Sequence, residues 1–483
     1  MIRGKFRRVM GIKPILFKKS KSINIKLQNS IHIIDSYLGN NKFEFLNLSI
    51  NFKEIDWNYA NHGKLWTYNL NYFDFLSQKN EQEKLKLIKS FVENSPKIKY
   101  GLEPFPISLR GINWIKYISY HKIKNQKIDD SLYAQYYILL DNVEYHLLGN
   151  HLLENGFSLL FGAYYFQDDV LYQKSKEILL EQLDEQILND GGHFELSPMY
   201  HQIMLFRLLD TINLVKNNDW KQKELLVFLK IKAKLMLGWL ERISYKNGDI
   251  PLFNDSSNDI APRTEQLINY SICLGLTTEQ TELKESGYRK IEDENYELVV
   301  DVGHVGASYI PGHAHADTFN FELRVDGRPF IVDTGLSTYE TCKRRDFERS
   351  TKAHNTVEVN GKNQSEVWGG FRVANRANVI HLKRSDDVIE ATHDGYSPIL
   401  HTRRWSFKGD KIVIEDKFNG SYNGVARLYF HPNIDKDEIR RRVKIKNFEW
   451  SIKDYFYALG FNSLSKSNFL EVKFNEKLNI YIE

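Results

Sequence analysis

The chain has little that would cross-link it, anchor it in a bilayer or attract nucleic acid. Its 483 residues include only two cysteines, Cys273 and Cys342, so no disulfide framework is expected. No window approaches the roughly 18 apolar residues of a membrane span, and we expect no integral membrane span. The net charge of +4 is small for this length, and the basic residues are spread out, which argues against nucleic-acid binding.

The N-terminal segment, residues 1–22, is basic but makes a poor secretory signal. Its apolar stretch is interrupted by Lys13 and Pro14, and no small-residue cleavage site follows. A disordered or surface-lying basic tail is the simpler interpretation. We therefore expect a cytoplasmic location, with a periplasmic location or export by a non-standard route as the alternative.

The hydrophobic pattern changes once along the chain. From about residue 80 to 280, apolar residues recur at three- and four-residue spacing, which is typical of helices. From about residue 290 the period becomes two, with turn signals such as Asp326-Gly327, which is typical of antiparallel strands. The pattern predicts an α+β multidomain protein with an N-terminal (α/α) toroid, or incomplete barrel, and a C-terminal antiparallel β-sandwich. The expected domains are 1–59 as a basic lead-in, 60–285 as the toroid and 286–483 as the sandwich.

Polar residues gather at helix ends in the helical half. Arg110 and Trp114 lie four residues apart on one helix face, which suits a carboxylate anchor beside a stacked ring and equally an ordinary surface pair. Asn150 and His151 stand beside Glu154, where helix capping alone is also a sufficient explanation.

A second polar segment follows the tight turn at Gly191-Gly192. It carries Glu195 and then Tyr200 at the expected start of a helix. A single tyrosine is usually a packed core residue. Tyr200 is therefore a catalytic candidate only in combination with the other polar segments.

Histidines and acids crowd residues 312–355. His313 and His315 are two residues apart, and on a strand they would face the same side. Two imidazoles and a carboxylate on neighbouring strands make a plausible divalent metal site.

Five short motifs occur in a fixed order between residues 150 and 356, within a longer stretch of about residues 60–430. They are Asn-His-x-x-Glu-Asn from residue 150, Gly-Gly-x-x-Glu-x-Ser-x-x-Tyr from 191, Gly-His-x-His-Ala-Asp from 312, Asp-x-Gly from 333 and Ala-His-Asn-Thr from 353. Each motif alone is weak, but the ordered set resembles the heparinase II/III polysaccharide lyases and is similar in layout to the oligoalginate lyases. The family's fold, a helical toroid followed by a β-sandwich, agrees with the change of period.

The resemblance implies β-elimination at a uronic acid of an acidic polysaccharide or oligosaccharide. Asn150 and His151 would meet the uronate carboxylate and stabilise the developing enolate-like charge. Tyr200 would protonate the departing O4 and is also a candidate for the base, and His313 would face the same sugar.

The resemblance also implies a metal and further substrate contacts. His315, Asp333 and His354 would hold a divalent ion, expected to be zinc with calcium as the alternative, in a structural role. Arg110, Trp114, Glu154 and Glu195 would contact the substrate.

Alternatives stay open at this point. The aromatic-rich segment 66–73 looks more like members found near bacterial surface-polysaccharide assembly functions, and either Tyr339 or Tyr396 could supply a second tyrosine. A non-catalytic glycan-binding or assembly protein would keep the fold without turnover. A glycoside hydrolase would need two carboxyl groups at matched separation, for which Glu154, Glu195 and Asp255 are candidates.

Overall fold

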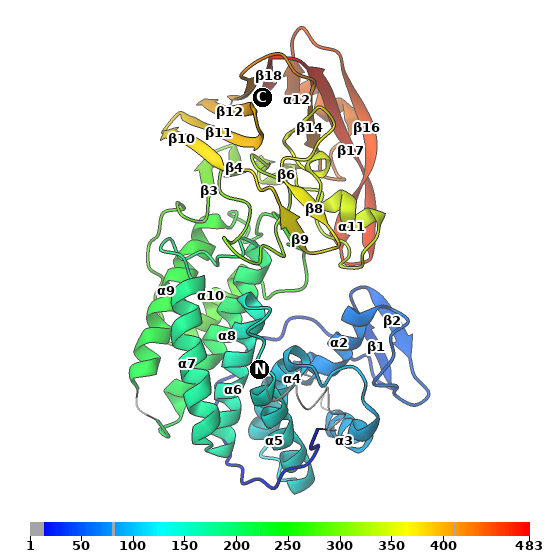
Figure 1. Cartoon of the computed structure of the whole chain (residues 1–483), viewed down its shortest axis with the longest axis vertical. Coiled ribbons are helices and arrows are strands. Elements are labelled where there is room, and N and C mark those ends of the chain that lie inside the picture. Colours follow the sequence, from blue (N-terminus) through cyan, green and yellow to red (C-terminus); the bar gives the residue numbers. More distant parts are fainter. Residues whose placement is uncertain (1–13, 80–82, 222, 410) are drawn as a thin grey trace. The chain divides into compact units, whose positions relative to one another are not determined.

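The computed structural model describes residues 14–79, 83–221, 223–409 and 411–483, so most of the predicted basic tail lies outside the described residues. The chain divides into two compact units, a helical unit and a β unit (Figure 1). The helical unit consists of Met1–Ile187, Gln202–Leu237 and Ala261–Glu279, and the β unit of Leu188–His201, Gly238–Ile260 and Gln280–Glu483.

The two units exchange chain segments. The predicted boundary near residue 285 lies close to Gln280, where the last segment of the β unit begins. Leu188–His201 and Gly238–Ile260, however, belong to the β unit although they lie between helices in the sequence. Consecutive domains therefore describe the units incompletely, because a helical period does not reveal which neighbour a short intervening segment packs against.

The helical unit is built from helices of nine to twenty residues and one small hairpin, β1 (Lys42–Phe45) and β2 (Leu48–Asn51). Its helices are α2 (Lys64–Tyr72), α3 (Lys84–Asn94), α4 (Pro104–Tyr120), α5 (Gln126–Asp141), α6 (Gly149–Phe166), α7 (Asp169–Gln186) and α10 (Thr264–Cys273). The 3-10 turns η1 (Asp74–Ser77) and η2 (Ser95–Lys97) follow α2 and α3, and α8 (Pro198–Asn217) and α9 (Glu224–Ile243) contribute residues to both units.

Helix α6 is the innermost helix of this unit. Every residue of α6 except His151 is buried, and a helix that is enclosed on all sides belongs to a core. A Cβ atom on Gly156 would come within 2.8 Å of Ile178 on α7, and one on Gly162 within 2.7 Å of Tyr136 on α5. These glycines therefore allow the neighbouring helices to approach closely.

The β unit contains antiparallel sheets, with strand orders β10-β11-β12-β13-β18-β15, β16-β17-β14-β7, β3-β4-β5-β6 and β8-β9. The strands are β3 (Tyr288–Glu292), β4 (Tyr296–Asp301), β5 (Phe321–Val325), β6 (Arg328–Ile331), β7 (Val357–Val359), β8 (Glu366–Trp368), β9 (Arg372–Ala374), β10 (Val379–Ser385), β11 (Val388–Tyr396), β12 (Ile399–Lys408), β13 (Lys411–Phe418), β14 (Gly424–Tyr429), β15 (Val443–Ile445), β16 (Trp450–Gly460), β17 (Ser463–Phe474) and β18 (Lys477–Ile482). Short helices α11 (Lys343–Glu348), η3 (Thr351–Ala353) and α12 (Lys436–Arg442) connect them.

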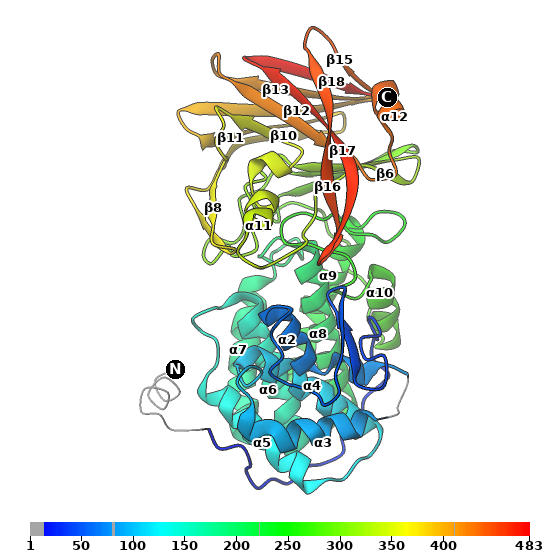
Figure 2. The ribbon, with the colours of Figure 1, turned by 90° about the vertical axis from the view of Figure 1, so that its right-hand side faces the viewer.

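One hydrophobic core joins the large sheets. Trp405 and Ile414 from the six-stranded sheet, Leu470 from the β16-containing sheet and Phe321 from β5 belong to one buried cluster. Figure 2 shows the strands of the six-stranded sheet beside β16 and β17. Sheets that share a core in this way form a β-sandwich, so the predicted change from helices to an antiparallel sandwich is confirmed.

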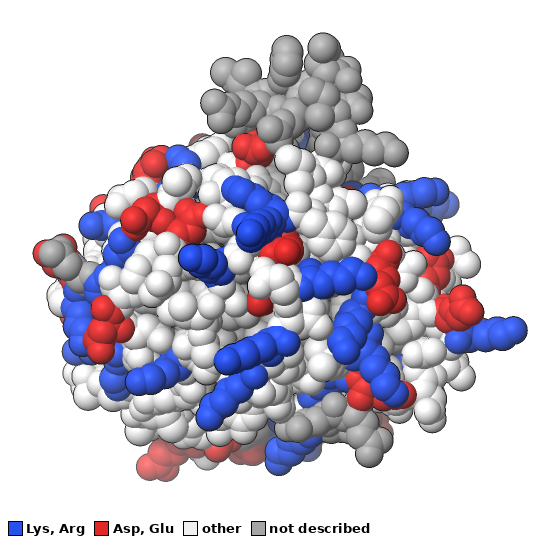
Figure 3. Space-filling view, turned by 90° about the horizontal axis from the view of Figure 1, so that it is seen from below, with Lys and Arg blue, Asp and Glu red and all other residues white. Residues whose placement is uncertain are grey.

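The molecular surface carries both signs of charge. On the face shown in Figure 3, lysine and arginine side chains are interspersed with acidic and uncharged ones. Among the described residues, no helix combines the length and the apolar character that crossing a membrane would require.

A buried network of charged side chains connects the six-stranded sheet to the backbone at Phe319 and Asn355. Arg403 on β12 is fully buried and donates to both carboxylate oxygens of Asp416 on β13, at 2.7 and 2.8 Å. Its Nη1 also donates to the backbone oxygens of Phe319 and Asn355. Burial opposes ionisation of Asp416, but Arg403 and the hydrogen bond from His401 outweigh it and hold the pKa of Asp416 at about 2.

We expect Arg403→Met to lower the free energy of unfolding by about 3–5 kcal/mol, because it leaves the Asp416 carboxylate buried without its partner. Urea denaturation followed by tryptophan fluorescence measures the loss. Arg404→Met is the matched control on the same strand: the Arg404 side chain is 46% exposed and 3.8 Å from Glu390, and such a pair contributes about 0–1 kcal/mol. Equal losses in the two variants would contradict this interpretation of the network.

Candidate active site

His313 is the centre of a cluster of polar side chains within the β unit. Its ring stacks on that of Tyr200, with centroids 4.0 Å apart and planes inclined by 30°. The hydroxyl oxygens of Tyr200 and Tyr339 are 3.2 Å apart. On its two nitrogens, His313 faces Asp255 through Nδ1 (2.9 Å) and Glu195 through Nε2 (3.9 Å). The structure thus brings together the predicted residues Tyr200, His313 and Glu195.

The start of α8 is fixed to the segment that carries Asp255. Ser197, directly before the helix, accepts a hydrogen bond from the backbone N–H of Tyr200 (3.2 Å) and donates to the backbone oxygen of Asp255 (2.8 Å). Pro198 begins the helix, a position where its missing N–H costs nothing. The sequence Ser-Pro-x-Tyr therefore places Tyr200 in the first turn, and it holds that turn against Asp255.

Residues 312–317 form a loop, which differs from the strand geometry that the sequence suggested for His313 and His315. Backbone contacts hold this loop: the Asp255 N–H donates to the His313 oxygen (3.1 Å), and the His315 N–H donates to Asn254 Oδ1 (3.0 Å). The two rings do face one common group, because both hydrogen-bond the carboxylate of Asp255.

The side chains of His313, Tyr200 and Tyr339 are partly exposed, whereas the ion pair behind them is buried. The His313 side chain is 13% exposed, while Asp255 and Arg345 have no exposed surface. Burial raises the pKa values of the Tyr200 and Tyr339 hydroxyls well above the ordinary value, so both tyrosines are protonated at neutral pH. The cluster therefore offers proton donors beside a histidine.

The structure chooses between the two candidate second tyrosines. Tyr339 pairs with Tyr200. Tyr396 instead donates its hydroxyl hydrogen to the backbone oxygen of Val357 at 2.7 Å and is buried. Tyr339 is therefore the second tyrosine of the cluster.

An exposed aromatic side chain, Phe371, borders the cluster. Its ring stands edge-on to His313, with centroids 5.9 Å apart, and 5.2 Å from the Tyr339 ring, and 42% of it is exposed. Phe371 lies in the turn of the β8–β9 hairpin, directly after Gly369 and Gly370, which have φ of 57° and 79°. Sequence reasoning missed Phe371, although two glycines between aromatic residues signal a tight turn with exposed rings.

A group suited to a metal ion lies nearby in the same unit. Ligand atoms of Asp317, Asp333 and His354 lie within 4.8 Å of one another, and all three residues are buried. His354 Nδ1 is 2.8 Å from Asp333 Oδ2, and among the described residues neither His354 Nε2 nor Asp317 Oδ2 has a hydrogen-bond partner. Buried acceptors without donors fit a cation, and burial also raises the pKa of Asp317 to about 6.

The group overlaps the predicted ligand set but is not identical to it. It contains Asp333 and His354, as predicted, and adds Asp317, the last residue of the 312–317 motif. The His315 ring lies 5.3 Å from that of His354, with its Nε2 bonded to Asp255 and its Nδ1 without a partner among the described residues. His315 therefore stays a predicted ligand, through Nδ1 only.

Three predicted substrate contacts are enclosed within the helical unit. Arg110 donates to Gln135 and to two backbone oxygens, and Glu154 pairs with Arg207 at 3.0 Å. Trp114 packs against aromatic rings, and none of Arg110, Trp114 and Glu154 has exposed surface. The structure corrects their expected role to internal packing and pairing, because i, i+4 spacing places residues on one helix face without showing that the face meets solvent.

Asn150 and His151 stand at the first turn of α6. Asn150 is buried, and the His151 side chain is 37% exposed, with its Nδ1 3.3 Å from Glu144 and its ring 4.5 Å from that of Phe105. Their contact with a substrate carboxylate stays a prediction.

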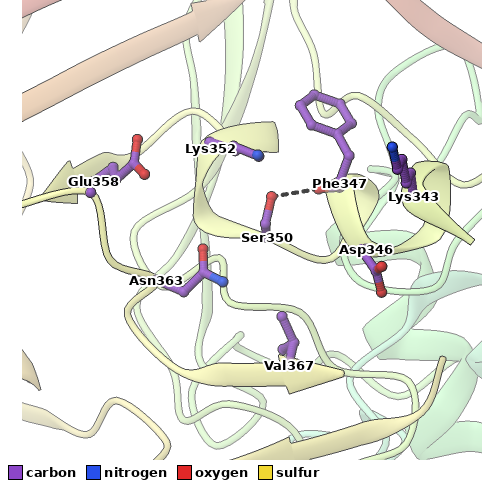
Figure 4. A pocket seen from close by; sticks show the side chains of 9 residues that line it. Lys343, Asp346, Phe347, Ser350, Lys352, Glu358, Asn363 and Val367 are labelled. Carbon is purple, nitrogen blue, oxygen red and sulfur yellow. Dashed lines mark hydrogen bonds between the residues drawn. The ribbon is translucent and has the colours of Figure 1, made fainter. Parts of the chain in front are cut away.

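A separate hollow of about 460 Å³ lies beside α11 and η3 (Figure 4). Its charged lining is mixed, with Lys343 and Lys352 against Asp346 and Glu358. Some of its polar groups make internal contacts: Ser350 donates to the backbone oxygen of Phe347 at 2.7 Å, and Glu358 accepts from Arg427 at 2.7 Å. We assign it no ligand.

Comparison with known proteins gives the chain a family. Residues 131–275 match the model of the heparinase II/III N-terminus, and residues 276–454 match that of the heparinase II/III-like C-terminal region. Heparin-sulfate lyases of Bacteroides stercoris and Pedobacter heparinus are 24% and 23% identical, over 59% and 61% of this chain and 46% and 48% of theirs. The chain thus spans about half the length of the curated relatives it matches.

Solved structures agree on the fold. A heparinase III crystal structure superimposes with a TM-score of 0.68 at 15% identity, covering 99% of this chain and 90% of the other. The heparan sulfate lyase HepC from Pedobacter heparinus gives 0.57 at 15% identity, with coverages of 92% and 81%. The sequence motifs, the two matched models and the shared fold together show that the chain belongs to the heparinase II/III family.

Proposed function

We propose that the chain is a polysaccharide lyase that cleaves a uronic-acid-containing glycan by β-elimination. The observation that supports this most directly is the stack of the Tyr200 and His313 rings. Tyr339 is hydrogen-bonded to Tyr200, and the buried Asp255–Arg345 ion pair lies behind the stack. The relatives are named heparin-sulfate lyases, so heparan-type glycans are the first substrates to test.

The chemistry needs one proton acceptor and one proton donor. Loss of the C5 proton leaves an electron pair that forms the C4–C5 double bond while the C4–O4 bond breaks. His313 would take the C5 proton at Nε2, since its Nδ1 faces Asp255. Tyr200, protonated at neutral pH, would deliver a proton to the departing O4. Asn150 and His151 remain the predicted partners of the uronate carboxylate.

The geometry disfavours a hydrolase. Of its candidate carboxyl groups, Glu154 is buried in a pair with Arg207, and Asp255 is fully engaged by Arg345 and two histidines. Glu195 alone is left near His313, whereas glycoside hydrolysis generally uses two carboxyl groups.

We further propose that Asp317, Asp333 and His354, with His315 through Nδ1, hold a divalent ion, with zinc as the expected metal. Nitrogen and carboxylate donors suit zinc. The ion would act structurally, by neutralising buried acids and joining the loop before β5 to the segments after β6 and before β7.

We expect Tyr200→Phe to keep the fold and to lower kcat by roughly 10²–10⁴-fold, because it removes the proton donor but keeps the ring. Formation of the unsaturated uronate is followed by ultraviolet absorbance on heparan-type glycans and then on other uronate glycans. Tyr396→Phe is the matched control, since it also removes one hydrogen-bonded tyrosine hydroxyl but lies outside the cluster. Full activity of Tyr200→Phe would refute this mechanism, and glycan binding without any product would favour a non-catalytic protein.

We expect His354→Ala to lower the bound metal and the Tm together, because it removes a ligand from a buried acidic group. Elemental analysis of the purified protein and a thermal melt measure the two effects. His381→Ala on β10, an exposed position, is the control. Wild-type protein that binds no zinc, with a Tm insensitive to both zinc and chelator, would rule out the site.

We expect Phe371→Ala to raise KM by roughly 3- to 10-fold with little change in kcat, the loss of about 0.5–1.5 kcal/mol of aromatic contact with a sugar ring. Phe456→Ala is the matched control, because Phe456 is 57% exposed on β16. An unchanged KM for Phe371→Ala would remove Phe371 from the substrate contacts.

A further inference from the structure

We propose that Asp255 is a positioning residue that holds His313 and His315 in opposite tautomers, with His313 protonated on Nδ1 and His315 on Nε2. The tautomers follow from hydrogen-bond geometry alone. Only their consequence for catalysis rests on the proposed function.

The carboxylate of Asp255 is saturated with donors. Oδ1 accepts from Arg345 Nη1 (2.5 Å) and lies 2.9 Å from His315 Nε2. Oδ2 accepts from Arg345 Nη2 (2.8 Å) and lies 2.9 Å from His313 Nδ1. Asp255 and Arg345 have no exposed surface, so no water replaces these contacts.

The bidentate contact with Arg345 keeps the Asp255 carboxylate ionised. The ionised carboxylate then determines which ring nitrogens of His313 and His315 carry hydrogens. An ionised carboxylate only accepts hydrogen bonds, so the ring nitrogen that faces it must carry the hydrogen. Arg345 supplies two hydrogen bonds and a positive charge to the Asp255 carboxylate. His313 therefore keeps its hydrogen on Nδ1 and His315 keeps its hydrogen on Nε2.

The remaining nitrogens point to different tasks. His313 Nε2 is the nitrogen nearer Glu195, on the ring that stacks against Tyr200. His315 Nδ1 is buried without an acceptor among the described residues, so a hydrogen there would be unsatisfied. Its ring lies 5.3 Å from that of His354 in the metal group. The Asp255 carboxylate thus leaves Nε2 as the unprotonated nitrogen of His313 and Nδ1 as that of His315. The first suits proton transfer, and the second suits a metal ion.

Backbone contacts hold the three residues in this arrangement. The Asp255 N–H donates to the His313 oxygen, and the His315 N–H donates to the neighbouring Asn254 side chain. Histidines two residues apart in the 312–317 loop can thereby place different ring nitrogens on one carboxylate.

The first experiment reads the tautomers directly in the full-length wild-type protein. Long-range ¹H–¹⁵N correlation on histidine-labelled protein, before and after treatment with a chelator, separates Nδ1–H from Nε2–H rings. His313→Gln and His315→Gln assign the two spin systems. We expect opposite tautomers, Nδ1–H for His313 and Nε2–H for His315 in the chelated protein. Identical tautomers, or the reverse assignment, would overturn the proposal without bearing on the lyase activity.

The second experiment replaces the carboxylate with an amide. Asp255→Asn keeps the shape but offers one acceptor and one donor group, so it cannot accept from both rings and Arg345. We expect kcat to fall by roughly 10- to 100-fold, with KM nearly unchanged and one histidine signal shifted to the other tautomer.

Asp416→Asn is the matched control, because Asp416 is equally buried, carries a bidentate Arg403 and accepts from His401. Its Tm should fall while kcat and both tautomers stay as in the wild type. A fall in kcat of similar size in both variants would reduce Asp255 to a general stabilising residue. If Asp255→Asn does not fold, the wild-type spectrum still decides.

Discussion

A charge that water cannot reach must be neutralised where it stands, and the active-site region depends on one such charge, the Asp255–Arg345 pair. Its partners are far apart in the chain: His313 is 58 residues from Asp255, His315 is 60 and Arg345 is 90. The Asp255 carboxylate has all of its hydrogen-bond donors only when Arg345, His313 and His315 are all in place. The side chains around His313 are therefore held by an ion pair that is complete only when the β unit is folded, and the proposed elimination would depend on such preorganisation.

The sandwich uses the same solution for a different purpose. Asp416 and Arg403 lie on adjacent strands, 13 residues apart, so their pair forms with the sheet itself. Arg403 then extends beyond its partner to the backbone oxygen of Asn355, the residue after His354. The sandwich core thereby contacts the backbone beside the metal group.

Short sequence patterns predicted the features that depend on residues close together in the chain. The change of hydrophobic period gave the two architectures, and the motifs named Tyr200 and His313, which do meet. Asp255 belongs to no motif, and its importance arises from contacts 58 to 90 residues away, which no spacing reveals. Arg110 failed for a related reason: periodicity gives the face of a helix, while its burial depends on what packs there.

The paired tyrosines show why a second hydroxyl helps the first. Two hydroxyls 3.2 Å apart share one hydrogen bond, so one of their two hydrogens stays free for the substrate. Either hydroxyl can donate in this bond, and burial raises the pKa values of both tyrosines. If Tyr200 protonates a leaving oxygen as proposed, its phenolate would keep a hydrogen-bond donor in Tyr339. Burial alone would destabilise the Tyr200 phenolate and so make Tyr200 a weaker acid. A hydrogen bond from Tyr339 to that phenolate would offset part of this effect.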